Sequence, residues 1–233
     1  KIEGDIDWIT QVELVDQNPI GKSSRSNPVT YVKAYDAIRE VYAEQPLSKM
    51  RGFLPKHFSF NVDGGRCDTC KGEGEQIVEM QFLFVVHLTC EVCKGHRFKE
   101  EILEIIFNQK NIYDVLQMSV EESLQFFAKE KAIVNAIKPL QDVGLGYIKL
   151  GQSSDTLSGG EAQRVKLATE LQRAHRGDAL YLLDEPSAGL HPADTDRLML
   201  HLQKLVDAGN TVVVVELDMR VVAQADYVVD LGP

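Results

Sequence analysis

The sequence has no long apolar run. Uninterrupted apolar stretches such as residues 212–215 are far too short to span a bilayer. No charged segment followed by an apolar one opens the chain, so we expect no secretion signal, no membrane partner and a cytoplasmic location. There is no positive excess either, because 35 acidic against 25 basic residues give a formal net charge of −10. This balance argues against a generally basic nucleic-acid surface, but not against a local basic patch.

Cysteine is also scarce, and its spacing excludes a disulfide framework. The four cysteines form two C-x-x-C pairs, each followed by Lys-Gly, which indicates a metal site in a reducing compartment. Two such turns supply four thiolates, so we predict a structural, tetrahedral Zn²⁺ site with no open position. We leave His87 and His96 out of the site and expect a β-hairpin over residues 76–88 to carry the turns. The predicted ligands are Cys67, Cys70, Cys90 and Cys93.

A phosphate-binding P-loop is missing. Gly21, Lys22 and Ser23 invite this interpretation, but the G-x-x-x-x-G-K-[ST] pattern would need glycine where Asp16 stands. Pro28 also follows where a helix should continue. The sequence therefore lacks the element that holds the β- and γ-phosphates of a nucleotide, and we expect this chain alone to bind ATP weakly.

Two stretches late in the chain carry phosphate chemistry. The first opens a predicted helix over residues 159–171 with a glycine pair, where backbone N–H groups and the helix dipole favour anions. The second is an apolar strand over residues 179–183 that ends in Asp184 and Glu185. One carboxylate there can hold Mg²⁺ through water, and its neighbour can polarise an attacking water. The helix opening consists of Leu157, Ser158, Gly159, Gly160 and Glu161.

Residues 49–66 reverse the local charge, because they hold four Lys and Arg residues against one Asp. Phenylalanines are interleaved with these cations. The segment is a candidate for contact with a phosphate backbone, with aromatic rings available for stacking. The alternative is an ordinary solvated loop over a small hydrophobic cluster. The DNA-contact candidates are Arg51, Lys56 and Arg66.

Apolar periodicity predicts alternating strands and helices. Strands are expected at 10–16, 98–107, 179–183, 211–215 and 226–230, and helices at 31–44, 119–128, 131–142, 159–171 and 192–208. This order favours an α/β fold with a largely parallel sheet covered on both faces. We found no internal repeat and no low-complexity segment.

The glycine-opened helix and the acidic strand end resemble the signature motif and Walker B strand of ABC-type ATPases. With the segments DQNPIGKSSRSNPVTY, CDTCKGEGE and YLLDEPSAGLHPAD, nearly the whole chain resembles the C-terminal half of the UvrA family. That family is the damage-recognition subunit of the bacterial UvrABC excision nuclease. Shorter UvrA paralogues linked to drug resistance fit the sequence equally well. A transporter-type ATPase domain does not, because transporters lack the zinc insert.

The resemblance implies a P-loop NTPase-like core with a helical signature subdomain and an inserted zinc module. It implies four parts: core with Q-loop at 1–48, zinc insertion at 49–108, signature subdomain at 109–175, and core with Walker B and D-loop at 176–233. The implied partners are damaged double-stranded DNA, UvrB and a second copy of the chain. The implied cofactors are ATP with Mg²⁺ and structural Zn²⁺.

Individual roles follow from the same resemblance. Gln17 corresponds to the Q-loop glutamine, Asp184 to the Mg²⁺-associated aspartate and Glu185 to the catalytic base. Residues 157–161 correspond to the signature, whose Ser158 would face a nucleotide held by another half, and residues 187–191 to the D-loop.

At the family's switch histidine, which hydrogen-bonds the γ-phosphate, this chain has Leu217. Leucine cannot donate that bond, so we predict slow hydrolysis. A binding module with impaired ATPase activity is therefore the alternative function.

Overall fold

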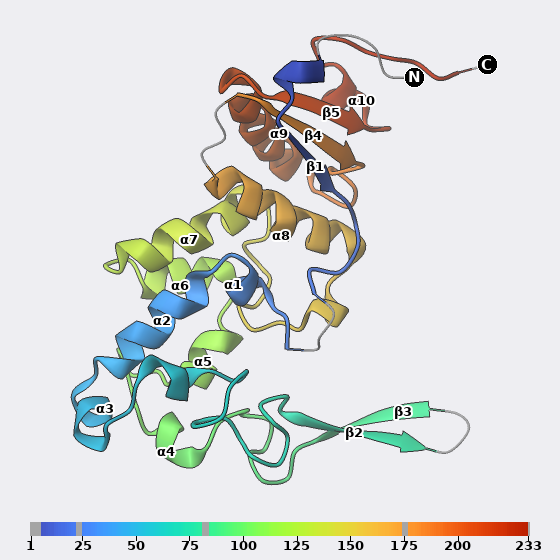
Figure 1. The fold of residues 1–233 in the computed structure, drawn as a ribbon. Coiled ribbons are helices and arrows are strands. Elements are labelled where there is room, and N and C mark those ends of the chain that lie inside the picture. The colour runs from blue at the N-terminus through green and yellow to red at the C-terminus, as the bar shows by residue number, and fades with distance from the viewer. Residues whose placement is uncertain (1–5, 22–24, 81–83, 174–176, 233) are drawn as a thin grey trace. The chain divides into compact units, whose positions relative to one another are not determined.

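The computed structural model describes residues 6–21, 25–80, 84–173 and 177–232 (Figure 1). The chain divides into two compact units. Unit 1 comprises Lys1–Ile20, Lys138–Gly146 and Asp155–Pro233, and unit 2 comprises Gly21–Ile137 and Tyr147–Ser154. The finer four-part division stays a prediction. None of the described helices has the length and apolar character needed to cross a membrane.

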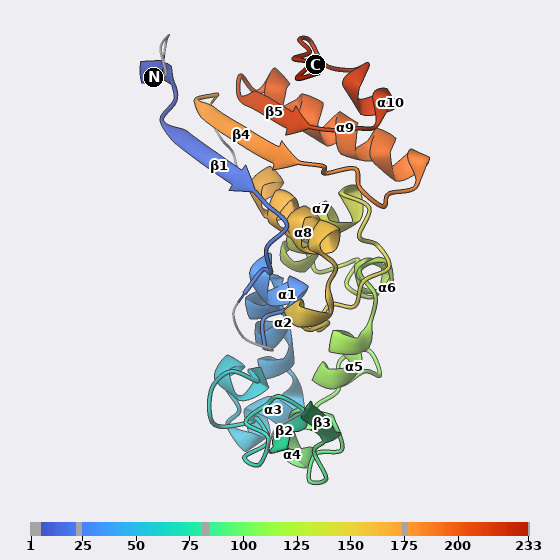
Figure 2. The same cartoon turned by 90° about the vertical axis from the view of Figure 1, so that its right-hand side faces the viewer.

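Unit 1 is built on a parallel three-stranded sheet. Its order is β1 (Gln11–Val15), β4 (Ala179–Asp184) and β5 (Thr211–Val215), with Val15 opposite Leu183 and Asp184 opposite Val215 (Figure 2). All three strands therefore end at the same edge of the sheet. The predicted parallel sheet with helices between its strands is confirmed.

Helices cover one face of this sheet. α8 (Gly159–Gln172) contacts β1 and α9 (Pro192–Asp207) contacts β5, and between them they bury Tyr181 and Leu183 of the central strand. The prediction that both faces are covered is wrong for the described residues. Leu14 is 63% exposed and Val215 60% exposed, because their side chains point to the other face.

The predicted strand at 226–230 is also wrong. These residues follow α10 (Met219–Val222) and are exposed, with Tyr227 among the most accessible side chains. β-Branched residues favour a strand only where a neighbouring strand accepts its hydrogen bonds. Among the described residues, no strand pairs with this segment.

Unit 2 is mostly helical. The predicted helix at 31–44 is divided by Lys33, whose left-handed backbone (φ 60°) separates α1 (Pro28–Tyr31) from α2 (Ala34–Ala43). The core includes the buried rings of Tyr42, Phe58 and Phe60. Its helices are α1 (Pro28–Tyr31), α2 (Ala34–Ala43), α3 (Pro46–Arg51), α4 (Glu100–Leu103), α5 (Ile112–Gln117) and α6 (Val120–Phe126), with α7 (Lys131–Asp142) continuing into unit 1. A short 3₁₀ helix lies at Pro55–Phe58 in unit 2, another at Ile6–Trp8 in unit 1, and a third, Ser154–Thr156, spans the boundary in the sequence between the units.

The zinc-module hairpin is present as β2 (Glu75–Met80) and β3 (Phe84–Thr89), paired antiparallel. Residues 81–83 of the predicted hairpin lie outside the described part of the chain. The strand predicted at 98–107 is wrong, because α4 occupies its centre. Ile102 and Ile105 are both fully buried, and this spacing of three places them on one side of a helical turn. Only Phe98, bridged to Arg66, and Phe107, bridged to Lys110, make sheet-like contacts.

Candidate functional site

The first turn of α8 presents a capped, partly exposed helix N-terminus. Ser158 is the N-cap, and its hydroxyl accepts a hydrogen bond from the N–H of Glu161 at 3.2 Å. The carboxylate of Glu161 accepts the N–H of Ser158 at 2.8 Å. Ser158 and Gly159 are exposed. The positive end of the helix dipole at this position can receive an anion.

The predicted nucleotide residues of unit 1 lie close together. A Cβ on Gly159 would stand 3.1 Å from the side-chain oxygen of Gln17. A Cβ on Gly160 would stand 3.5 Å from the carbonyl oxygen of Ala188, in the predicted D-loop. The amide nitrogen of Gln17 lies 3.5 Å from the carbonyl oxygen of Asp184. The loop after β1, the start of α8 and the end of β4 therefore meet in unit 1.

Glu185 has a left-handed backbone, with φ 45°. Such a conformation costs a non-glycine residue about 1–3 kcal/mol and persists only when the surroundings hold it. Here the N–H of Glu185 donates to the carbonyl of Val215 at 2.8 Å. Its side chain is half-buried, and that of Asp184 is exposed. The two carboxylates therefore stand at the edge where the parallel strands end.

The sequence analysis missed Glu216. Its side chain connects the predicted D-loop to the segment that contains Leu217. Its carboxylate accepts the N–H of Ser187 at 2.9 Å, and the N–H groups of Leu217 and Asp218 at 3.1 and 3.3 Å. The side chain of Leu217 is 82% exposed. The sequence signal that could have identified Glu216 is its position directly after the β-branched residues 211–215.

Polar residues inside α8 were missed as well. Gln163, Arg164 and Lys166 reach the ends of β1 and β4 and the segment after β4. Gln163 and Arg164 are buried, although they interrupt the apolar side of the helix. A buried polar residue normally marks a specific partner, and that signal could have identified them.

The four predicted metal ligands lie together in unit 2. Their sulfur atoms are all within 4.8 Å of one another, with 3.9 Å between Cys67 and Cys90 and 3.6 Å between Cys70 and Cys93. Sulfurs at ~2.3 Å from a tetrahedral zinc ion lie about 3.8 Å apart, so the cluster fits a Zn²⁺ ion.

The two C-x-x-C turns share one backbone geometry. Lys71 and Gly72 have φ of 54° and 85°, and Lys94 and Gly95 have φ of 51° and 84°. In the first turn, the N–H of Gly74 donates to the sulfur of Cys70 at 3.3 Å. The Lys-Gly pair after each turn thus lets the chain bend back so that N–H groups approach the sulfurs.

The surroundings of Cys67 and Cys93 stabilise the negatively charged thiolate to different degrees. Burial raises the pKa of Cys67, but hydrogen bonds from the N–H groups of Cys70 and Thr69 and from the thiols of Cys70 and Cys93 together lower that pKa to about 7. Burial raises the pKa of Cys93 to about 12. The ring of His96 packs on Tyr113 with 4.6 Å between centroids, and the side chain of His87 lies outside the described part.

The three predicted DNA contacts have different surroundings. The side chain of Arg66 is only 13% exposed, forms an ion pair with Asp63 at 2.8 Å and donates to the carbonyl of Lys71 at 3.1 Å. Arg51 forms an ion pair with Glu104. Lys56 is exposed. The two arginines therefore have structural partners within the chain, and Lys56 is the better candidate for an external phosphate.

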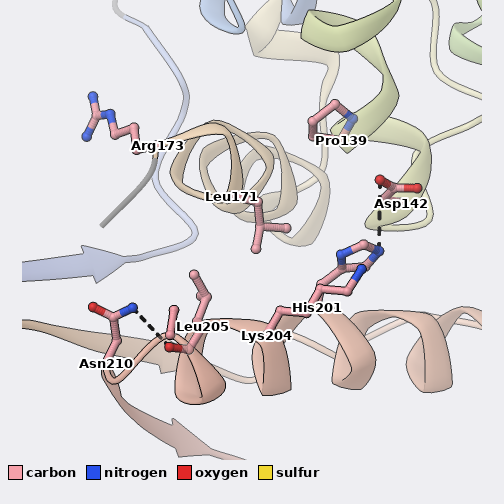
Figure 3. Close-up of a pocket in the computed structure, with 9 residues that line it drawn as sticks. Pro139, Asp142, Leu171, Arg173, His201, Lys204, Leu205 and Asn210 are labelled. Atoms are coloured by element: carbon pink, nitrogen blue, oxygen red, sulfur yellow. Dashed lines mark hydrogen bonds and ion pairs between the residues drawn. The ribbon is translucent and has the colours of Figure 1, made fainter. Parts of the chain in front are cut away.

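A separate cavity of about 450 Å³ lies toward the C-terminal end of α8 (Figure 3). His201 faces Asp142 across it, with 4.0 Å between the imidazole and the carboxylate. Burial lowers the pKa of His201. None of the residues predicted to bind nucleotide, metal or DNA lines this cavity.

The curated relatives compared with this chain share one name, UvrABC system protein A. No family model matches the chain. UvrABC system protein A of Aquifex aeolicus is 55% identical over 233 residues, which cover 100% of this chain and 25% of that protein. The same protein of Thermus thermophilus is 52% identical over 232 residues, covering 100% of this chain and 24% of that protein.

A solved structure agrees with these relatives. The crystal structure of UvrA2 from Deinococcus radiodurans matches with a TM-score of 0.90 and 53% identity, over 97% of this chain and 28% of that one. The chain thus spans about a quarter of the length of the curated relatives it matches. By sequence over its whole length and by fold, the chain belongs to the UvrA family and corresponds to a segment of a UvrA protein.

Proposed function

We propose that this chain is part of an ATPase of nucleotide excision repair that binds distorted duplex DNA and couples ATP turnover to the loading of UvrB. The observation that carries the ATPase proposal is the meeting of Gln17, the start of α8 and the end of β4 in unit 1. In this proposal Gln17 and Glu185 orient and activate water, and Asp184 holds Mg²⁺ through water. The location is cytoplasmic.

The chain supplies one half of a composite site. Ser158, Gly159 and Gly160 would face the phosphates of a nucleotide held by a P-loop outside this sequence, with the helix dipole stabilising negative charge. Such an arrangement requires a second ATPase half or a second copy of the protein. A homodimer is therefore part of the proposal. The Zn²⁺ ion is structural, because four thiolates leave no open position.

The ATPase proposal is tested by Glu185→Gln in the intact protein that contains this chain. The substitution keeps the size of the side chain and removes the base, so turnover should fall at least ~10²-fold while ATP still binds. Glu130→Gln is the matched control. Unchanged turnover in Glu185→Gln would refute the role of Glu185.

A second candidate is a zinc-containing binding module in which the ATPase parts only organise a dimer. Leu217 favours it, because this side chain cannot donate a hydrogen bond to a phosphate. The two candidates differ in one measurement. A binding module would bind DNA with the same affinity with and without ATP, and an active ATPase would not.

DNA contact is tested at Lys56, since replacing Arg51 or Arg66 would also break ion pairs within the chain. Lys56→Glu should weaken binding of a damaged duplex and lower its salt dependence. Lys129→Glu makes the same charge change on another exposed lysine and should have little effect. Equal affinity in both variants would leave residues 49–66 as ordinary surface.

A further inference from the structure

Gln163 joins the ends of two strands through one side chain. It is 1% exposed, and its Nε2 donates to the carbonyl oxygen of Val15 at 2.8 Å and to that of Asp184 at 2.7 Å. Both amide hydrogens are thereby used. The orientation of the amide is fixed, because a reversed amide would place its oxygen against two carbonyl oxygens.

These two bonds lie where the sheet ends. The β1–β4 ladder stops at the pair Val15 and Leu183. Beyond it, Gln163 replaces the missing backbone partner and sets the spacing of the two strand ends. Gln17 lies two residues after Val15, and Glu185 directly follows Asp184. The amide therefore bridges the two strand ends beside the two residues proposed to act on water.

Two neighbours of Gln163 hold the loops beyond the strand ends. The ammonium of Lys166 forms an ion pair with the carboxylate of Asp16 and donates to the carbonyl of the same residue at 3.2 Å. The guanidinium of Arg164, 4% exposed, donates to the carbonyl of Ala188 at 3.3 Å. One turn of α8 thus contacts the loop after β1, the end of β4 and the segment after it.

We propose that Gln163 is a positioning residue that sets the geometry of Gln17 and Glu185, and that Lys166 and Arg164 hold the two flanking loops to the same helix. α8 begins at the signature residues. A displacement of its N-terminus would therefore move both loops through the contacts of Lys166 and Arg164. The inference rests on the proposed function for the roles of Gln17 and Glu185. The attachment of the strand ends and loops to α8 depends only on the contacts of Gln163, Arg164 and Lys166.

The test compares backbone hydrogen exchange and ATP turnover in the intact protein. Gln163→Met keeps the length of the side chain and removes both donors. Leaving two carbonyls without their partner should raise amide exchange about tenfold at residues 16–18 and at residues 185, 187 and 188, with the centre of β4 unchanged. The turnover number should fall about tenfold or more, with the affinity for ATP within twofold. Gln203→Met, on the exposed side of α9, is the matched control.

Two further variants keep the proposal testable if Gln163→Met unfolds. Lys166→Met should raise exchange only at residues 16–18, and Arg164→Met only at residues 187–191. Exchange that rises everywhere in unit 1, or at neither loop, overturns the proposal. Unchanged turnover in Gln163→Met, with wild-type turnover present, also overturns it. A wild-type protein without turnover refutes the proposed function instead, and the exchange pattern still decides the attachment to α8.

Discussion

Ser158 and Glu161 cap one another at the first turn of α8. The serine hydroxyl accepts the glutamate N–H, and the glutamate carboxylate accepts the serine N–H. This reciprocal pair satisfies two backbone donors that a helix start otherwise leaves open. The residue proposed to face a phosphate is therefore also the residue that begins the helix.

The two roles of Ser158 can be separated by substitution. Ser158→Ala should lower the free energy of unfolding by about 1 kcal/mol, because alanine cannot cap the helix. Ser158→Asp keeps the cap, so its thermal unfolding should resemble the wild type. Its negative charge would stand against the proposed phosphate, and ATP binding by the intact protein should weaken. Wild-type ATP affinity in Ser158→Asp would mean that the signature does not face the nucleotide.

The cysteine cluster predicts one bound zinc ion per chain. Cys93→Ser removes a thiolate, so elemental analysis should find the metal lost or greatly reduced. Val92→Ser alters an exposed side chain of the same turn and should retain zinc. Full zinc content in Cys93→Ser would contradict a four-thiolate site.

Zinc uptake should depend on pH. With the pKa of Cys93 at about 12 in the metal-free cluster, its thiol is protonated at neutral pH. Binding must then release protons, and affinity should rise as the pH increases. Calorimetry in buffers of different ionisation enthalpy measures this release. A zinc affinity that is constant between pH 6 and 8 would contradict the ligand assignment.

Leu217 stands where the family resemblance implies a histidine. Leu217→His should increase ATP turnover by the intact protein, because one donor to a developing charge is typically worth ~10²–10³ in rate. Leu200→His makes the same change at an exposed leucine of α9 and should leave turnover unchanged. Family-level turnover in the wild type would show that the histidine is dispensable.

The ion pair of Asp16 with Lys166 predicts a pH effect. The hydrogen bond from Lys166 is the largest cause that holds the pKa of Asp16 below its usual value of 3.8. A depressed carboxyl pKa stabilises the fold above that usual value, and the stabilisation is lost as the pH falls through the lowered one. Lys166→Met should raise the pKa of Asp16, as followed by NMR titration, and remove this contribution. An unchanged Asp16 titration would mean that the pair does not form in solution.

Much of the fold followed from sequence patterns alone. The C-x-x-C spacing identified four sulfurs that do lie within 4.8 Å, because each turn brings its two cysteines to one point. The periodicity of residues 159–171 identified α8, and the glycine pair Gly159 and Gly160 marked its start. These features are local, so their residue types suffice to predict them.

Tertiary structure decided the rest. Residues 226–230 have strand-like composition, yet strands form only against a partner, and among the described residues none pairs with them. The hydrogen bond from Gln163 to Val15 joins residues 148 positions apart, which no spacing rule anticipates. The sequence by itself determined which four cysteines cluster and where the acidic strand end lies. Which side chain joins the ends of β1 and β4 was decided by long-range packing, because contacts between distant segments depend on how the strands and α8 come together.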